Sequence, residues 1–150
     1  MARKNQAASL EEPTESALAM SQFELALIVA KNAFEQWVSR CAAAAGAPGF
    51  SPLEMQVMHM VDHKGRPKRV SDIAFSLKIE DNHIVAYALK KLTKAGLVAS
   101  ERNGKETVYT TAPAGQELVA RYRVVRQRCL IQPFTIFDDE AMDLVALSDL

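Results

Sequence analysis

The spacing of apolar residues predicts a mostly helical chain, beginning with one long helix. From Ser16 to Ala45 neither proline nor glycine interrupts the sequence, and apolar residues recur on one broad helical face. This face consists of Leu27, Ala30, Ala33, Phe34, Trp37 and Val38. Leu25, Ile28 and Val29 lie off it, which gives more apolar surface than one contact covers. We therefore expect a long amphipathic helix that also meets a second surface, such as another subunit.

Capping signals mark the next two helices. Ser51 suits the N-cap, Pro52 the first helical position and Glu54 the capping-box position of a second helix. Its inward residues are expected to be Leu53, Val57, Met60 and Val61, and it ends in the polar stretch 62–69. Ser71 is expected to cap a short third helix. That helix has a small apolar stripe of Ile73, Ala74 and Leu77.

A fourth helix and a hairpin follow. Residues from about 80 to 95 carry Val85, Ala88, Leu89 and Leu92 at helical spacing. Gly96 stands where a helix end needs a left-handed residue. Two β-suited runs, 97–102 and 105–111, are joined by Asn103-Gly104, a strong hairpin signal. A two-residue turn would set Glu101 opposite Glu106, and a three-residue loop would set it opposite Lys105. Like-charge repulsion favours the second register.

The remaining segments predict two more helices and a loose leader. Pro113 and Gly115 open a fifth helix that Pro133 closes. Its expected inner side consists of Leu118, Tyr122, Val125 and Cys129. Asp138 and Asp139 start a short terminal helix, where acids suit the helix dipole. Residues 1–15 are polar and without periodicity, so we expect a flexible leader there. The chain has no internal repeat.

Composition indicates one compact domain and excludes several classes of protein. A chain of 150 residues can bury a real core. Cys41 and Cys129 have neither metal-type spacing nor the pattern of a disulfide framework. The polar start lacks the apolar core of a signal peptide, and the apolar run 25–30 is too short to cross a bilayer. We therefore expect a cytoplasmic protein without a membrane partner.

The net charge is zero, but the charges are unevenly distributed. The segment from Lys64 to Lys105 holds ten basic and four acidic residues, an excess of six positive charges. Such an excess is typical of a phosphate-binding footprint. Charge alone fits a solvated helix surface equally well.

The order of the elements resolves that choice in favour of DNA. Three helices followed directly by a tight hairpin form the winged helix-turn-helix pattern, in which the last helix enters the major groove. With its apolar stripe assigned to the core, the fourth helix presents Asn82, His83, Ala86, Tyr87 and Lys90 outward. These residue types bond base edges or phosphates, or allow close approach to a thymine methyl. The alternative is that Tyr87 and His83 only cover exposed helical turns.

The stretch from Ala88 to Val98, the hairpin and Ala114-Gly115 together resemble the MarR family of bacterial regulators, over residues 20–148. The resemblance implies a mainly α fold with a small β-hairpin, a winged helix-turn-helix with flanking dimerisation helices. Residues 16–45 and 112–150 would form the homodimer, and residues 51–111 the DNA-binding lobe, within one domain over 16–150. By position, Asn82, His83, Ala86 and Tyr87 fall where the family reads bases. The other predicted DNA contacts are Lys68, Arg69, Lys90, Lys91, Arg102 and Lys105.

Two departures from the family pattern are visible. The family wing is usually longer and has an Asp-x-Arg element that places an arginine in the minor groove. This wing has only Arg102-Asn103-Gly104-Lys105. The family also often has a threonine three residues before the glycine of the next helix. Here that position is Ala112, with Thr111 as a substitute cap.

Other chemistry has weaker support. Some members of the family sense oxidants through a cysteine, but Cys41 and Cys129 are explained as well by burial. His59 and His63 are spaced to share a metal ion, yet no further ligands can be named. No phosphate-binding loop or catalytic motif is present, so we expect neither an enzyme nor a cofactor.

The sequence therefore predicts a sequence-specific regulator that binds double-stranded DNA as a homodimer on a pseudo-palindromic site. A small-molecule effector would fit a cleft floored by Phe34, Trp37 and Met58, although a packed core explains these residues equally well. The main alternative is a winged helix that docks a protein partner. The lysines at 90, 91 and 94 favour DNA, because docking faces usually carry apolar or aromatic anchors.

Overall fold

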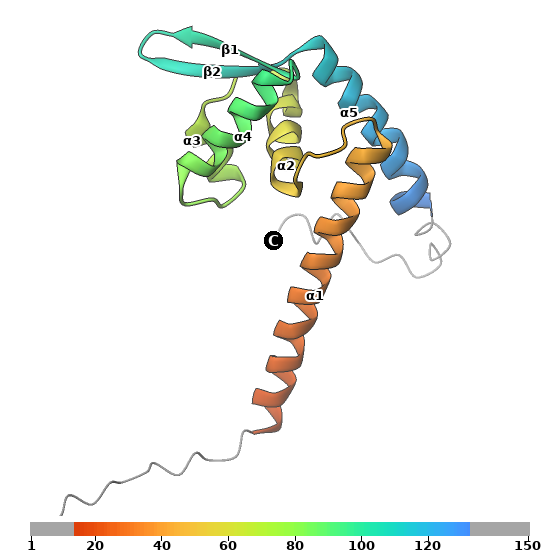
Figure 1. The fold of residues 1–150 in the computed structure, drawn as a ribbon. Coiled ribbons are helices and arrows are strands. Elements are labelled where there is room, and N and C mark those ends of the chain that lie inside the picture. Colours follow the sequence, from red (N-terminus) through yellow and green to blue (C-terminus); the bar gives the residue numbers. More distant parts are fainter. Residues whose placement is uncertain (1–13, 133–150) are drawn as a thin grey trace, which may run out of the picture. The chain divides into compact units, whose positions relative to one another are not determined.

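The computed structural model describes residues 14–132. The chain divides into two compact units, residues up to Glu35 and residues from Gln36 onward, and each is considered by itself. The elements in order are α1 (Glu15–Ala44), α2 (Pro52–Asp62), α3 (Val70–Ser76), α4 (Asn82–Lys94), β1 (Val98–Asn103), β2 (Glu106–Thr111) and α5 (Pro113–Arg126), as Figure 1 shows. A 3-10 turn spans His63–Gly65, and a π-helical turn spans Gln127–Ile131. The predicted mainly α fold with one hairpin is confirmed. Most of the predicted leader and the terminal helix lie outside the described residues.

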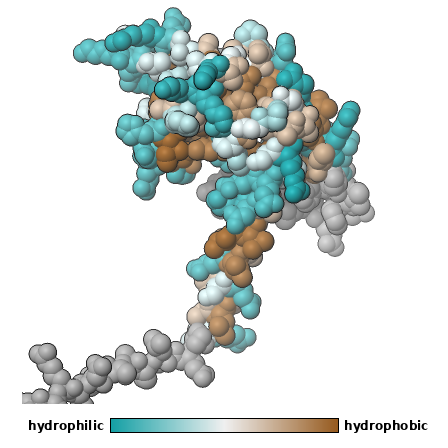
Figure 2. Space-filling view, in the orientation of Figure 1, coloured by the Kyte–Doolittle hydropathy of each residue, from teal (hydrophilic) through white to brown (hydrophobic). Residues whose placement is uncertain are grey.

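The first unit consists of the first two thirds of α1. Its apolar side chains are more than half exposed, namely Leu18, Met20, Phe23, Leu25, Leu27, Ile28 and Val29, at 51–61%. Figure 2 shows hydrophobic side chains along this helical segment. An ion pair of 2.7 Å joins Lys31 and Glu35 one turn apart on the polar side. None of the described helices is long and apolar enough to cross a membrane.

The main core of the second unit joins α2, α3 and α4. All four residues expected to face inward from α4 are buried, and they pack with Val57, Val61 and Ile73. The helix ends as predicted, because Gly96 takes a φ of +72° just beyond it. In Figure 1 these helices form one group with the hairpin beside it. The winged helix-turn-helix arrangement is therefore present in the second unit.

A second cluster joins the end of α1 to α2 and α5. Val38, Cys41 and Ala42 are buried there with Leu118 and Tyr122. Cys129 was expected on the same stripe, and this prediction is wrong because its side chain is exposed. The α-helix ends at Arg126 and continues as the π turn. That turn has a different number of residues per turn, so Cys129 is rotated away from the stripe.

The helix caps agree with the sequence at α2 but not at α3 or α5. The Ser51 Oγ accepts from the Glu54 amide at 3.2 Å, and the Glu54 carboxylate accepts from the Ser51 amide at 2.8 Å. Ser71 does not cap α3. The helix starts at Val70, two residues earlier than a Ser71 cap would give, and Asp72 accepts from the amide of Arg69 at 3.0 Å. Thr111 does not cap α5 either, since it ends β2 and Ala112 takes the N-cap position without a side-chain bond.

Both expected hairpin registers are wrong. The strands pair Asn103 with Glu106 and Glu101 with Val108, so the two turn residues are Gly104 and Lys105. Gly104 has a φ of +63°, whereas Lys105 is not among the residues with positive φ. This is the pattern of a turn with glycine at the first central position, rather than the Asn-Gly turn that the sequence suggested. Because Glu101 lies opposite Val108, the repulsion expected between Glu101 and Glu106 does not arise.

Gly115 is required where α5 begins against the start of the wing. A Cβ atom at this position would lie 2.1 Å from the carbonyl oxygen of Leu97 and 2.7 Å from Cε of Met58. The amide of Ala112 donates to that same Leu97 carbonyl at 3.0 Å. The absence of a side chain therefore lets the base of the hairpin, α2 and α5 meet closely.

Candidate nucleic-acid interface

The outer face of α4 carries the residues that the sequence assigned to base reading. The side chain of Asp81 accepts from the amide of His83 at 2.8 Å and so caps the helix. Asn82, His83, Tyr87 and Lys90 are exposed and Ala86 is half-buried. Tyr87 is 71% exposed, an unusual state for a large aromatic side chain. Because Val85 and Leu89 hold the opposite face in the core, this helix presents a continuous polar and aromatic surface.

The wing is joined to the segment before α3 through backbone atoms. The amide of Lys68 donates to the Tyr109 carbonyl at 3.0 Å, and the amide of Tyr109 donates to the Lys68 carbonyl at 2.9 Å. This backbone pairing holds β2 beside the start of α3, and a groove lies between α3, α4 and β2. Its lining residues are Arg69, Val70, Ser71, Asn82, His83, Ala86, Glu106, Thr107 and Tyr109. The structure thus brings Arg69 together with three of the predicted base-reading residues.

Arg69 forms an ion pair with Glu106 in this groove. Its Nε lies 2.9 Å from the Glu106 carboxylate, and both side chains are 54% exposed. The sequence assigned no role to Glu106. The signal that could have found it was the alternation along β2, but this depends on the hairpin register, in which Glu101 pairs with Val108 instead of Glu106 or Lys105.

Two of the predicted DNA-binding lysines are engaged within the protein. The Lys68 ammonium donates to the carbonyls of Val61 at 3.1 Å, Arg66 at 3.2 Å and His63. Burial, together with the charge of Arg66, lowers the pKa of Lys68. These three acceptors match the three N–H donors of an ammonium group. A DNA contact by Lys68 would therefore require these bonds at the end of α2 to break.

The second lysine, Lys91 of α4, reaches the start of α2 with its ammonium group. Its ammonium is 2.8 Å from the Glu54 carboxylate and 2.9 Å from the carbonyl of Gly49, and it lies over the ring of Phe50. Burial alone would raise the pKa of Glu54, but hydrogen bonds from Lys91 and Ser51 outweigh it and hold the pKa below its ordinary value. Lys91 thereby ties the last turn of α4 to the capping box of α2.

Arg102 and Lys105 belong to the wing, as expected. Lys105 is exposed in the turn itself, and Arg102 donates from Nε to the carbonyl of Gly104 at 3.3 Å. Both cations therefore lie at the tip of the hairpin, where charge is available to a phosphate backbone.

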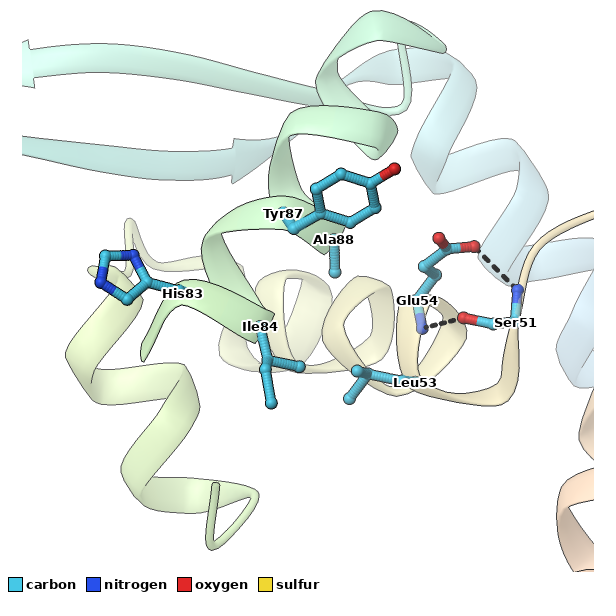
Figure 3. A pocket seen from close by; sticks show the side chains of 7 residues that line it. All are labelled: Ser51, Leu53, Glu54, His83, Ile84, Tyr87 and Ala88. Atoms are coloured by element: carbon cyan, nitrogen blue, oxygen red, sulfur yellow. Dashed lines mark hydrogen bonds between the residues drawn. The ribbon is translucent and has the colours of Figure 1, made fainter. Parts of the chain in front are cut away.

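A second hollow lies beside the first, on the α2 side of α4. Figure 3 shows Ser51, Leu53, Glu54, His83, Ile84, Tyr87 and Ala88 around it, with the ring of Tyr87 above the capping box. Most of its lining surface is apolar, and Ile84 is 46% exposed. Sequence reasoning missed Ile84, and it missed Phe75 on α3, which is 76% exposed with the Lys78 ammonium over its ring.

The surroundings of Cys41 and His59 are those of buried side chains. Cys41 is buried, and that burial raises the pKa of its thiol, whereas a reactive cysteine needs a lowered one. His59 lies edge-on to Tyr122, with ring centroids 4.6 Å apart, and burial lowers its pKa. Among residues 14–132, no three histidine, cysteine or acidic side chains are grouped as they would be around a metal ion.

Comparison with known proteins agrees with this geometry. The family profile for the winged helix DNA-binding domain matches residues 50–115. No curated protein sequence matches the chain significantly. Many solved structures do match in fold. Reduced AbfR bound to DNA, a protein of Staphylococcus epidermidis, has a TM-score of 0.71 at 19% identity over 91% of this chain and 94% of that one.

Two further structures have similar scores. A MarR family regulator from Neisseria meningitidis has a TM-score of 0.66 at 16% identity, over 87% of this chain and 92% of that one. Staphylococcus aureus MarR in complex with salicylate and kanamycin has a TM-score of 0.67 at 15% identity, over 87% and 85%. Residues 50–115 therefore match a winged helix DNA-binding domain, and the fold of the chain is similar to that of MarR family structures.

Proposed function

We propose that this protein is a sequence-specific regulator that binds double-stranded DNA in the cytoplasm through α4 and the wing. The observation that carries the proposal is the exposed face of α4, on which Asn82, His83, Ala86 and Tyr87 lie beside a groove that the wing closes. Asparagine bonds adenine edges, and a small alanine admits a thymine methyl. These four side chains are proposed to read bases.

A separate set of cations is proposed to bind phosphates. Lys90 lies at the exposed side of α4, Arg69 at the start of α3, and Arg102 and Lys105 on the wing. Contacts of this kind fix the orientation of a protein on the duplex and make its affinity depend on salt. Lys68 and Lys91 are proposed to contribute mainly by stabilising the fold of this lobe, because both ammonium groups already have partners within the protein.

We further propose that the protein acts as a homodimer. The first two thirds of α1 expose eight large apolar side chains, the seven named above and Phe34, a patch that a soluble monomer rarely carries. We assign residues 16–45 and 112–150 to the dimer interface and residues 51–111 to the DNA-binding lobe. A two-fold dimer would place two copies of α4 in successive major grooves, with half-sites roughly 34–36 Å apart.

Selection of genomic fragments by the purified protein at near-physiological salt tests the proposal. Enrichment of an inverted repeat with half-sites one helical turn apart is the expected result. A shuffled fragment of the same base composition is the control, because it retains the phosphate backbone and loses the base order. Weak, salt-sensitive binding without enrichment would contradict sequence-specific regulation.

We also propose that a small-molecule effector regulates DNA binding by this protein. The solved structure of Staphylococcus aureus MarR holds salicylate, which is an aromatic carboxylate. We propose a ligand of that chemical class for this protein too. Compounds that bind the folded state raise the melting temperature. If no compound that alters DNA binding shifts the melting temperature, the effector is excluded.

A second candidate function is docking of a protein partner by the same lobe. Tyr87, Ile84 and Leu53 line a mostly apolar hollow, and such side chains anchor protein interfaces. A protein-docking lobe would bind random and genomic DNA equally weakly. The fragment selection therefore separates the two functions directly.

A further inference from the structure

The groove between α3, α4 and the wing has one acidic side chain. Of its nine lining residues, Glu106 alone carries a negative charge and Arg69 alone carries a permanent positive one. The two are paired with each other at 2.9 Å rather than with other groups. A carboxylate at this position disfavours a DNA phosphate, which bears the same sign of charge.

The backbones of both residues are held in place. The Arg69 amide donates to Asp72, and the preceding residue, Lys68, is joined to Tyr109 by two backbone hydrogen bonds. Glu106 starts β2 directly after the Gly104-Lys105 turn and pairs with Asn103. The carboxylate is therefore held within reach of the guanidinium.

We propose that Glu106 competes with DNA phosphate for the guanidinium of Arg69. In the free protein the carboxylate occupies the position that a phosphate oxygen would take. Binding of DNA exchanges the pair between Arg69 and Glu106 for one between Arg69 and phosphate. The exchange is feasible because the two side chains are half exposed, and exposed ion pairs are weak and screened by salt. Glu106 thus limits the affinity of this lobe for the DNA backbone.

The inference rests on the proposed function only in assuming that duplex DNA occupies the groove. It does not require sequence specificity, so it can be measured on a short duplex of random sequence. The variant is Glu106→Gln, which keeps the shape of the side chain and removes its charge. Glu101→Gln is the matched control, since Glu101 is an exposed acid on the other strand of the wing and pairs with Val108.

The affinity of each full-length variant for the duplex is measured by fluorescence anisotropy at several salt concentrations. Relative to Glu101→Gln, the Glu106→Gln variant is expected to bind about three- to tenfold more tightly, because no ion pair within the protein has to break, while the log–log salt slope stays nearly the same, because Arg69 neutralises one phosphate in either protein. Adding Arg69→Gln to Glu106→Gln should abolish this gain. Circular dichroism confirms that each variant is folded.

Three results would overturn the inference. Equal effects of the two glutamine variants would mean that only overall charge matters. Weaker binding by Glu106→Gln would mean that the carboxylate positions Arg69 or contacts a base itself. A gain that survives Arg69→Gln would mean that another cation is released. None of these results bears on whether the wild-type protein enriches an inverted repeat, so the two proposals fail separately.

Discussion

The carboxylate of Glu54 and the ammonium of Lys91 meet at 2.8 Å and join the start of α2 to the last turn of α4. The Glu54 side chain is only 9% exposed, whereas that of Lys91 is 42% exposed. The same carboxylate accepts from the amide of Ser51 and so completes the capping box. One acidic group therefore caps α2 and fixes the position of α4, the helix proposed to face DNA.

Glu54→Gln is expected to lower the free energy of unfolding by about 1–2 kcal/mol at neutral pH, because the amide cannot neutralise Lys91. Since the pKa of Glu54 is below its ordinary value of 4.5 in the folded state, the stability that its charge supplies is full above pH 4.5 and is lost as the pH falls through the folded pKa. Urea denaturation from pH 7 to pH 3 checks this. The gap between the wild type and Glu54→Gln should narrow on acidification, and a constant gap would contradict it.

Tyr87→Ala is expected to cost about 1–3 kcal/mol of binding free energy on the enriched site and little on random DNA. The physical reason is that the exposed ring lies on the proposed base-reading face. Anisotropy titrations with both duplexes measure the difference, and Tyr87→Phe separates the ring from its hydroxyl. Equal losses on both duplexes would make Tyr87 a backbone contact.

Lys90→Ala and Lys91→Ala remove the same charge from adjacent positions and should behave differently. Lys90 is exposed, so its loss is expected to reduce the salt slope of DNA binding by about 0.9. Lys91 is held by Glu54 and Gly49, so its loss should lower the melting temperature and leave the slope nearly unchanged. Salt titrations and thermal melts of both variants check this. The reverse assignment would place Lys91 on the DNA.

Gly115→Ala is expected to destabilise the protein by about 1–3 kcal/mol, because the added Cβ would collide with the Leu97 carbonyl. Ala114→Ser in the same helical turn is the control, since Ala114 is exposed and the change should stay within about 0.5 kcal/mol. Thermal or urea denaturation measures both. A fully stable Gly115→Ala protein would show that α5 can move away from the wing without cost.

Leu25→Asp is expected to shift the protein from dimer to monomer, because a charge in an apolar interface is costly. Gln22→Asp introduces the same charge at another exposed position of α1 and serves as the control. Light scattering at several concentrations gives the mass. A wild-type protein that is monomeric at working concentration would contradict the dimer before any variant is made.

The local features of this protein could be predicted from its sequence. The stripe from Val85 to Leu92 recurs at the helical period, and Ser51 and Glu54 lie three residues apart, so both patterns are contained in one short segment. The exposed face of α4 was then predicted as the residues that remain once this stripe is assigned to the core. Predictions of this kind depend only on the geometry of a single helix.

The partners of the charged side chains could not be predicted in the same way. Lys91 and Glu54 are 37 residues apart, and the contact between Arg69 and Glu106 depends on a hairpin register that turn chemistry alone did not settle. The lysines at 68, 90 and 91 look alike in sequence. Only the packing of α2 against α4 and the end of α2 shows that two of them are engaged inside the protein.

The wing is fastened to the segment before α3 by amide and carbonyl groups of Lys68 and Tyr109, not by their side chains. These hydrogen bonds join main-chain amides and carbonyls, which every residue except proline carries in full, so they do not depend on the side chains that line the groove. The side chains that line the groove, at positions 82, 83, 86 and 107, can therefore be exchanged without dismantling the scaffold that presents them. This separation makes the lobe a suitable framework for engineering altered DNA preferences.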